Sequence, residues 1–251
     1  MLELRNLSRH FGGVKAVDTL DLSVRQGEIL GLIGPNGSGK STTVNLITGV
    51  YQPTAGTVTF KGQDISAVPP HQRCELGLAR TFQNIRLFGH LTVWQNLWAA
   101  RVVREKGWAG FRQRWLSGAA AAREEAERLL VFGDLAHKRD MLAGNLAFGE
   151  QRRLELIRAA ASGAELLLLD EPAAGMNAEE IHDLDDRIRS LRDQGHTILL
   201  IEHHMELVME VCDRVAVLNF GRKIAEGTPA QVQADAQVRA AYLGTDEPAA
   251  A

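Results

Sequence analysis

The sequence predicts an α/β fold in which a mainly parallel sheet is flanked by helices. After residue 150, short apolar runs of strand length alternate with longer amphipathic stretches of helical period. Earlier in the chain, a glycine-rich segment joins one such apolar run to another helical stretch. Strands that alternate with helices pair in parallel, because each helix carries the chain back to the start of the next strand.

The first 60 residues predict a β-rich subdomain that leads into the parallel sheet. Residues 2–30 alternate apolar and polar side chains around the Gly12–Gly13 break, which is typical of antiparallel strands joined by turns. Ile29–Ile33 reads as a buried strand, and a helix is expected over Ser41–Val50. Further short strands are expected around Gly56–Phe60.

A helical insertion and a return to the α/β rhythm are predicted for the rest of the chain. From about Pro69 to Gly144, Ala, Arg, Glu and Leu dominate and no strand is expected. The later elements are a helix to about Ala161, strand Leu166–Asp170, helix Glu179–Arg192, strand Thr197–Glu202, helix Glu206–Cys212 and strand Val215–Asn219. We expect one domain over 1–251, with a core at 1–68 and 163–230, an insertion at about 69–162 and a tail at 231–251, of which 246–251 is frayed.

Composition is that of an ordinary globular protein and disfavours nucleic acid as a partner. The chain has 28 Lys and Arg against 31 Asp and Glu, for a net charge of -3, so no bulk attraction to nucleic acid exists. Cys74 and Cys212 form no CxxC pair, which argues against a disulfide framework or a cysteine-rich zinc site. No signal peptide and no run of about 18 apolar residues is present, so we expect a cytoplasmic chain that does not cross a membrane alone.

The glycine-rich segment predicts a phosphate-binding loop. Gly34-Pro35-Asn36-Gly37-Ser38-Gly39-Lys40-Ser41 fits G-x-x-x-x-G-K-[ST] between a strand and a helix. Glycines let successive backbone N–H groups face an anion, and the following helix adds its positive end. Lys40 is expected to reach the β- and γ-phosphates, and the Ser41 hydroxyl to hold Mg²⁺.

Two carboxylates at the end of a buried strand complete a predicted hydrolysis site. Asp170 and Glu171 follow Leu166–Leu169, and ligands of open α/β sheets bind at the carboxyl ends of strands. We expect Asp170 to hold Mg²⁺ through oxygen and Glu171 to accept a proton from, or orient, an attacking water. Without the phosphate loop, the same pair would more often cap a helix.

The segment before that strand resembles the signature motif of ATP-binding cassette (ABC) ATPases. It reads Asn145-Leu146-Ala147-Phe148-Gly149-Glu150-Gln151. In that family the glycine and the following helix N-terminus bind the γ-phosphate of ATP held by the opposite subunit. Ala147 stands where the family has a serine and Glu150 where it has a glutamine, so a hydroxyl contact is lost and a negative charge is added.

Other elements that resemble this family follow in order along the chain. Phe11 matches the aromatic that stacks on adenine, and Gln83 the glutamine that contacts Mg²⁺ or water and senses the membrane subunit. His203 aligns with the switch histidine that contacts the γ-phosphate, or His204 does if the strand register slips by one. Zinc is disfavoured at this pair because no further His or Cys lies at ligand spacing.

The resemblance and the motifs together assign ATP and Mg²⁺ as the ligands of the chain. The residues expected to bind ATP are Phe11, Gly34, Asn36, Gly37, Ser38, Gly39, Lys40, Ser41, Thr42, Ala147, Gly149 and Glu150. Mg²⁺ is assigned to Ser41, Gln83 and Asp170, and catalysis to Glu171, His203 and Gln83.

A closer resemblance is to the LivG-type ATPase subunits of branched-chain amino acid importers. Segments 80–88, 145–149, 169–177 and 241–244 carry it, and in that subgroup Ala147 and Asn177 are usual. The resemblance implies a peripheral subunit at the cytoplasmic face of the plasma membrane that hydrolyses ATP in a head-to-tail pair. Its implied partners are two integral membrane permease subunits, a second identical or homologous ABC ATPase and, indirectly, an external substrate-binding protein.

Alternatives remain open at this stage. The cargo can be branched-chain amino acids, urea or amides, aromatic acids or lipopolysaccharide, and a soluble ABC ATPase without a transport role is a further candidate. Residues 94–115 hold all four tryptophans among several arginines and predict either an amphipathic helix pair or a partner surface. By the resemblance, Phe82, Ile85, Leu87, Phe88 and part of Leu91–Leu97 line a groove for the permease.

Overall fold

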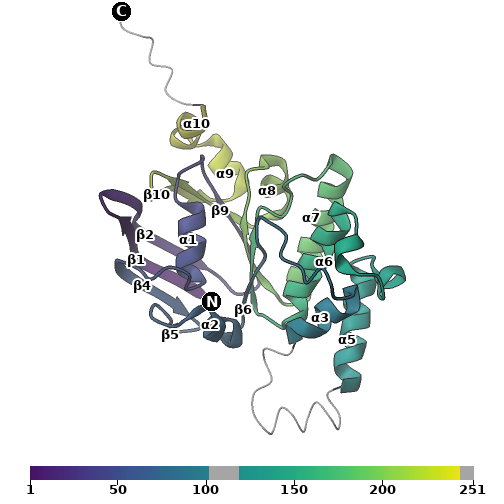
Figure 1. Ribbon diagram of the computed structural model, residues 1–251. Coiled ribbons are helices and arrows are strands. Elements are labelled where there is room, and N and C mark those ends of the chain that lie inside the picture. Colours follow the sequence, from purple (N-terminus) through teal and green to yellow (C-terminus); the bar gives the residue numbers. More distant parts are fainter. Residues whose placement is uncertain (102–118, 244–251) are drawn as a thin grey trace, which may run out of the picture. The chain divides into compact units, whose positions relative to one another are not determined.

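The computed structural model describes residues 1–101 and 119–243 (Figure 1). The chain divides into two compact units. The first unit joins Met1–Arg73 to Gly195–Ala251, and the second is Cys74–Gln194. The first unit is therefore built from both ends of the chain, and the second from its middle.

The first unit begins with an antiparallel sheet that confirms the predicted β-rich start. The strands adjoin in the order β2, β1, β4 and β5, and their bounds are Val14–Val24, Leu2–Phe11, Ala55–Phe60 and Gln63–Asp64. Leu2 pairs with Val24 on one side and with Phe60 on the other. These three apolar side chains are buried, so alternation along the strands directs one face into the core.

A second set of strands in this unit carries the glycine-rich loop. Strand β3, Ile29–Ile33, pairs in parallel with β8, Thr197–Ile201, and with β9, Arg214–Asn219. All residues of β3 and β8 are buried, as expected for strands covered on both faces. Strand β10, Arg222–Gly227, is antiparallel to β9. The helices are α1 (Lys40–Ile47), α2 (Pro70–Leu76, which ends in the second unit), α8 (Met205–Val211), α9 (Pro229–Ala234) and α10 (Ala236–Leu243).

The second unit combines helices with two parallel strands. Strand β6, Leu78–Arg80, pairs in parallel with β7, Leu166–Asp170. The helices are α3 (Val93–Arg101), α5 (Ala119–Phe132), α6 (Phe148–Ala161) and α7 (Ala178–Asp193), with 3-10 turns at Ala136–Lys138 and Ala143–Asn145. The stretch from Pro69 to Gly144, expected to be mostly helical, also contains strand β6. Strand β6 has three residues, too few to show a period of two, and its pairing with β7 defines it.

The other predicted elements are present, with boundaries that move by a few residues. Strands β3 and β7 have the predicted bounds, and α1, α7, α8 and β9 begin or end within three residues of them. Elements β5, β10, α9 and α10 come from the structure alone, whereas α2, α3 and α5 lie in the stretch predicted to be mostly helical. Within residues 1–101 and 119–243, no helix has the length and apolar character that spanning a membrane requires.

Only part of the tryptophan-rich segment falls within the described residues. Trp94 and Trp98 lie one turn apart on α3, and their rings stack with centroids 5.1 Å apart. Trp108, Phe111 and Trp115 lie outside the described residues, as do residues 246–251, for which a frayed end was expected.

Candidate nucleotide-binding and hydrolysis site

The glycine-rich loop forms a backbone cradle between β3 and α1. Gly34 has φ +148°, and a Cβ there would lie 2.1 Å from the Leu218 carbonyl oxygen. Gly39 has φ +106°, and its Cβ would lie 2.5 Å from the Ala16 carbonyl oxygen. Both positions therefore require glycine, for conformation and for space.

Polar groups of the loop fit a phosphate. The Ser38 hydroxyl is buried and has no hydrogen-bond partner among the described residues, and a buried unpaired polar group is costly unless a ligand engages it. The Lys40 ammonium donates to the Gly34 and Pro35 carbonyl oxygens at 2.6 and 3.0 Å, which holds it over the loop. Ser41 is exposed and Thr42 half-buried on the first turn of α1. The loop and Lys40 thus fit a phosphate anion, and the Ser41 hydroxyl fits a cation bound to that phosphate.

A pocket of about 540 Å³ opens beside this loop within the first unit. Pro35, Asn36, Gly37 and Ser38 line one side, and the β9–β10 turn and α10 line the others. The sequence predicted the glycine-rich loop but not the part of the pocket lining that α10 contributes, because α10 is distant from the loop in sequence. Burial raises the pKa of Tyr242 on α10, and a hydrogen bond from the Gly34 backbone opposes that rise.

Phe11 lies at the end of β1 with its ring partly exposed. Its ring contacts Tyr51 edge to face, with centroids 5.3 Å apart, and the Arg9 guanidinium lies 4.7 Å from the ring centroid. An exposed aromatic face held by two neighbours is suited to stacking on a flat ring such as adenine. Tyr51 and Arg9 were not among the predicted residues.

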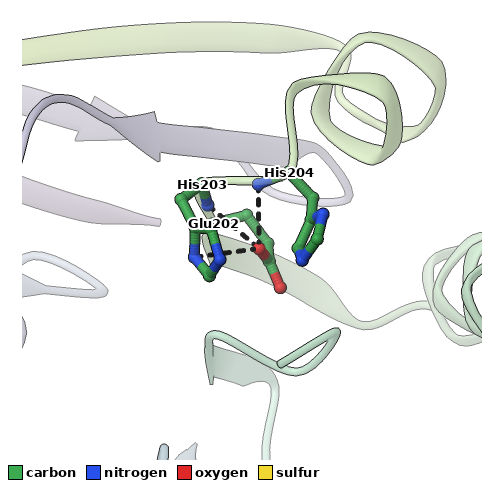
Figure 2. A group of neighbouring side chains, drawn as sticks. All are labelled: Glu202, His203 and His204. Carbon is green, nitrogen blue, oxygen red and sulfur yellow. Dashed lines mark hydrogen bonds and ion pairs between the residues drawn. The ribbon is translucent and has the colours of Figure 1, made fainter. Parts of the chain in front are cut away.

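The two histidines follow β8 and share a buried glutamate. Glu202 is fully buried, and its Oε2 accepts hydrogen bonds from the backbone N–H groups of His203 and His204 at 2.9 and 3.2 Å (Figure 2). His203 Nδ1 lies 3.8 Å from the same oxygen, and the His203 side chain is 52% exposed. His204 is the N-cap residue of α8. The His203 imidazole is thus exposed, while its backbone is fixed by the Glu202 carboxylate.

In the second unit, Asp170 is the buried last residue of β7. Its Oδ2 accepts a hydrogen bond from Arg80 Nη2 at 2.8 Å, and both side chains are largely buried. Its backbone N–H donates to the Thr81 hydroxyl at 3.2 Å. The carboxylate predicted to hold Mg²⁺ is therefore paired with an arginine that sequence reasoning missed.

Glu171 and Gln83, two of the residues expected to act in catalysis, are in hydrogen-bond contact. The Gln83 amide donates to Glu171 Oε2 at 2.8 Å. Glu171 has φ +48°, a region that non-glycine residues adopt at a cost of about 1 kcal/mol or more and that is frequent at functional sites. The segment around Gln83 is fixed by Arg152, which donates to the Phe82 and Gln83 carbonyl oxygens.

Glu155 on α6 also bonds to the backbone of the segment around Gln83. Its Oε1 accepts from the backbone N–H groups of Phe82 and Arg86 at 3.3 and 3.4 Å, and burial raises its pKa. Strand β6 thus leads directly into a loop whose backbone is bonded to α6.

The predicted signature motif forms the N-terminus of α6, with Ala147 as the N-cap residue. Glu150 accepts a hydrogen bond from the Ala147 N–H at 3.0 Å and forms an ion pair with Lys138 at 2.5 Å. The Lys138 ammonium is the main reason that the pKa of Glu150 is lowered. The negative charge added at this position is thereby compensated within the same unit.

Gly149 lies against α7. A Cβ at Gly149 would lie 2.4 Å from Glu180 Oε1. Glu180 also accepts a hydrogen bond from the Asn177 N–H at 2.9 Å and closes a capping box with it. No predicted residue had indicated this contact between the signature segment and the start of α7.

Comparison with known proteins decides the family, because the ABC transporter family model matches residues 17–174. The chain belongs to this family. A second model, for branched-chain amino acid ATP-binding cassette transporters, matches residues 222–248 of the cassette. The family assignment covers the glycine-rich loop, the signature segment and the acidic pair.

Among curated relatives, LivG of Salmonella typhimurium, a high-affinity branched-chain amino acid transport ATP-binding protein, is 42% identical over 97% of this chain and 98% of its own. BraF of Pseudomonas aeruginosa, described in the same words, is 41% identical over 97% and 98%. LptB of Haemophilus influenzae, a lipopolysaccharide export system ATP-binding protein, is 36% identical over 97% of each chain.

Solved structures give the same fold. A nucleotide-free ATP-binding cassette from an ABC transporter is 32% identical, with a TM-score of 0.84 and coverage of 97% of this chain and 99% of its own. A cassette solved in its ADP conformation is 33% identical, with a TM-score of 0.85 and coverage of 97% of this chain and 98% of its own. The predicted fold class, that of an ABC ATPase with a parallel sheet, is confirmed.

Proposed function

We propose that this ABC cassette is the ATP-hydrolysing subunit of an importer for branched-chain or related hydrophobic amino acids. The observation that carries the chemistry is the 2.8 Å hydrogen bond from Gln83 to Glu171, next to the buried Asp170. The observation that favours the cargo is the likeness to LivG and BraF together with the match of residues 222–248.

Phosphate binding falls to the loop and its lysine. The backbone N–H groups from Gly37 to Lys40 face the ATP phosphates, and the Lys40 ammonium leaves the loop carbonyls for the γ-phosphate. Phe11 stacks on the adenine. Ser41, Asp170 and Gln83 would hold Mg²⁺, which would supply positive charge against the charge that develops on the phosphates.

Hydrolysis falls to the acidic strand end and the histidine. Glu171 orients the attacking water and accepts its proton, and Gln83 fixes the carboxylate through the bond described above. The exposed imidazole of His203 contacts the γ-phosphate and stabilises it in the transition state. We place this role on His203 because its carboxylate anchor leaves the ring exposed, whereas His204 begins α8.

A second ABC ATPase, identical or homologous, completes the site in a head-to-tail pair. Ala147, Gly149 and Glu150 of one chain then contact the γ-phosphate held by the other, through backbone N–H groups at the α6 N-terminus. Closure of the pair excludes water, and hydrolysis lets it reopen. We infer a single ABC ATPase domain over residues 1–251 that works as a peripheral subunit on the cytoplasmic face of the plasma membrane.

The transport partners are two integral membrane permease subunits and, indirectly, an external substrate-binding protein, and we propose no nucleic acid partner. Among the residues expected to line the permease groove, Phe88 is 54% exposed. The Arg80 and Arg86 guanidiniums lie 5.0 and 4.8 Å from the Phe82 ring centroid. Arg86→Glu or Leu87→Asp is expected to release the subunit from membranes with basal ATPase activity retained. Unchanged membrane association would contradict this surface.

The catalytic proposal is tested with Glu171→Gln. Because a positioned base supplies about 10²- to 10⁴-fold in rate, we expect ATP binding to persist and turnover to fall by that factor. Glu179→Gln, at an exposed acidic residue on α7, is the matched control and should turn over as the wild type does. Turnover within a few-fold of the wild type in the Glu171 variant would contradict the assignment.

The transport proposal is tested by recovering the Glu171→Gln protein from native membranes with ATP and Mg²⁺ and identifying its partners by mass spectrometry. Recovery of two permease subunits and a second ATPase is the expected result, followed by uptake assays with leucine, isoleucine and valine. Recovery of lipopolysaccharide export components would favour the function of the LptB relative instead. Recovery of soluble proteins alone would keep the ATPase and overturn transport.

A further inference from the structure

Two adjacent imidazole rings point to the same side of the chain after β8. In a regular strand, consecutive side chains point to opposite faces, but the chain turns after Glu202 to begin α8. The ring centroids of His203 and His204 therefore lie only 4.6 Å apart, with the ring planes inclined by 36°. The Glu202 carboxylate lies between the two rings (Figure 2).

This arrangement supplies three metal-ligating groups at one point. One ligand atom from each of Glu202, His203 and His204 lies within 4.8 Å of the other two. Two imidazoles that bind the same ion through nitrogen at about 2.1 Å hold their ring centres roughly 4.6 Å apart at a right angle and roughly 5.3 Å apart at the tetrahedral angle. The observed 4.6 Å lies at the lower end of this range, so a tetrahedral site needs the two rings to open by less than about 1 Å. We propose that Glu202, His203 and His204 form a binding site for a divalent transition metal ion such as Zn²⁺.

Burial and hydrogen bonding prepare the site for a cation. Glu202 is fully buried, and two backbone N–H groups fix its Oε2. A fixed ligand loses little conformational entropy when the metal binds, and hydrogen bonds to a ligating carboxylate are a usual feature of such sites. The exposed half of the His203 side chain provides the entry path and room for a water as the fourth ligand.

The donor set selects the class of metal. Two imidazole nitrogens and one carboxylate oxygen suit Zn²⁺, Ni²⁺, Co²⁺ or Cu²⁺. Mg²⁺ prefers an octahedral shell of oxygens and water, so the ion proposed for hydrolysis does not compete here. The sequence argument against zinc considered only histidine and cysteine ligands, and the carboxylate supplies the third.

A metal in this site inhibits the ATPase, a consequence that rests on the proposed role of His203. A His203 ring that binds the metal through one nitrogen is held beside Glu202, so its other nitrogen is no longer free to move to a γ-phosphate. Metal binding itself does not depend on that role, so the two claims can be tested separately.

The binding test uses the full chain, without a histidine tag, nucleotide-free and with Mg²⁺ present. Zn²⁺ affinity is measured by competition with a chromophoric chelator, and Co²⁺ is added to record the visible absorption that reports coordination geometry. His204→Asn removes one ligand but keeps a good N-cap residue for α8, so the fold is retained. Glu202→Gln is the second variant, and thermal melting checks that both are folded.

Two control variants separate this site from other zinc ligands on the chain. His71→Asn removes an exposed histidine on α2, and Cys74→Ser removes an exposed thiol. We expect one Zn²⁺ per chain, an affinity loss of at least about 10-fold in His204→Asn and Glu202→Gln, and wild-type affinity in both controls. Equal affinity in His204→Asn and the wild type, or loss of binding in Cys74→Ser, would overturn the site.

Inhibition is then measured at constant Mg²⁺ and ATP with increasing Zn²⁺. The wild type is expected to lose turnover over the concentration range in which the metal-binding titration saturates, and His204→Asn to need at least 10-fold more Zn²⁺ for the same fractional loss. Saturation of the site with turnover unchanged would overturn the inhibitory consequence and the proposed role of His203 while leaving the metal site. Inhibition that is the same in both proteins would overturn the link to this site.

Discussion

Arg73 is fully buried on α2 and bonds to four backbone carbonyl oxygens of the first unit, which makes Arg73→Met an informative perturbation. Its Nη1 donates to Leu46 and Ile47, the last residues of α1, at 2.7 Å each. Its Nη2 donates to Ser66 at 3.0 Å and its Nε to Val68 at 2.8 Å. The last carbonyl groups of a helix have no partner within it, so Arg73 completes the helix that begins at the phosphate loop.

Methionine fills similar volume but leaves four acceptors without this donor. At about 1 to 1.5 kcal/mol net for each bond, the loss is roughly 4 to 6 kcal/mol. Part is offset because the guanidinium no longer has to be desolvated, the same effect that lowers the pKa of Arg73 to about 10. We therefore expect Arg73→Met to reduce the free energy of unfolding by about 3 kcal/mol, close to the cost of breaking a buried charged contact.

The pH dependence of this loss has a defined sign. A base whose pKa falls on folding holds fewer protons in the folded state, so its contribution changes only above pH 10, where stability rises with pH. The difference between wild type and Arg73→Met should therefore be constant from about pH 6 to pH 9.

Denaturant unfolding measures the prediction, with Arg25→Met as the control at an exposed arginine. The control should lie within about 0.5 kcal/mol of the wild type. Arg73→Lys, which has one donor centre in place of a fork, should lie between wild type and Arg73→Met. A value for Arg73→Met within about 0.5 kcal/mol of wild type would refute the bond-by-bond reasoning.

Two further changes test contacts of the signature segment. Lys138→Met removes the ion pair that lowers the pKa of Glu150, so it should cost up to about 1 kcal/mol at neutral pH. The cost should begin to decline as pH falls below the ordinary Glu150 pKa of 4.5 and vanish below the lowered pKa of the folded state. Denaturation at neutral and acidic pH measures both, and a cost that persists in strong acid would contradict the ion pair. Gly175→Ala places a Cβ 3.0 Å from the Phe148 ring at φ +79°, whereas Gly195→Ala at φ +99° meets no atom. By thermal unfolding, Gly195→Ala should cost about 1 kcal/mol from backbone strain and Gly175→Ala more, and equal costs would mean that the Phe148 contact is unimportant.

The strands that are buried over their whole length could be predicted from the sequence. Ile29–Ile33 and Leu166–Asp170 are uninterrupted apolar runs between turn residues, and the structure gives them those bounds. Strand β6 could not be predicted, because Leu78, Ala79 and Arg80 carry no period, and hydrogen bonds to β7 create the strand. The local sequence pattern thus predicts a strand that is buried over its whole length. A very short strand instead depends on its pairing with a neighbour.

The place of the glycine-rich loop between β3 and α1 could be predicted, because its pattern is local. Each glycine, the lysine and the serine act through a few consecutive residues, so spacing alone specifies them. The pairing of Arg80 with Asp170 joins residues 90 apart in sequence. Nothing near Arg80 marks it as the partner of a carboxylate, since an arginine at the end of a strand is usually solvated.

The motif gives one reason for a glycine at position 149, and the structure adds a second. The motif requires Gly149 so that a backbone N–H can approach a phosphate, but Glu180 Oε1 already occupies the space of a Cβ there. Phe148, the preceding residue, covers Gly175 in the loop that follows Glu171. Glu180 therefore covers Gly149, and Phe148 covers Gly175. Each of the two segments contributes one glycine and one covering side chain. Because packed side chains transmit displacement, a shift of the loop after Glu171 is expected to move the N-terminus of α6. The Glu180 and Phe148 contacts would thereby couple the proposed base to the segment proposed to bind phosphate.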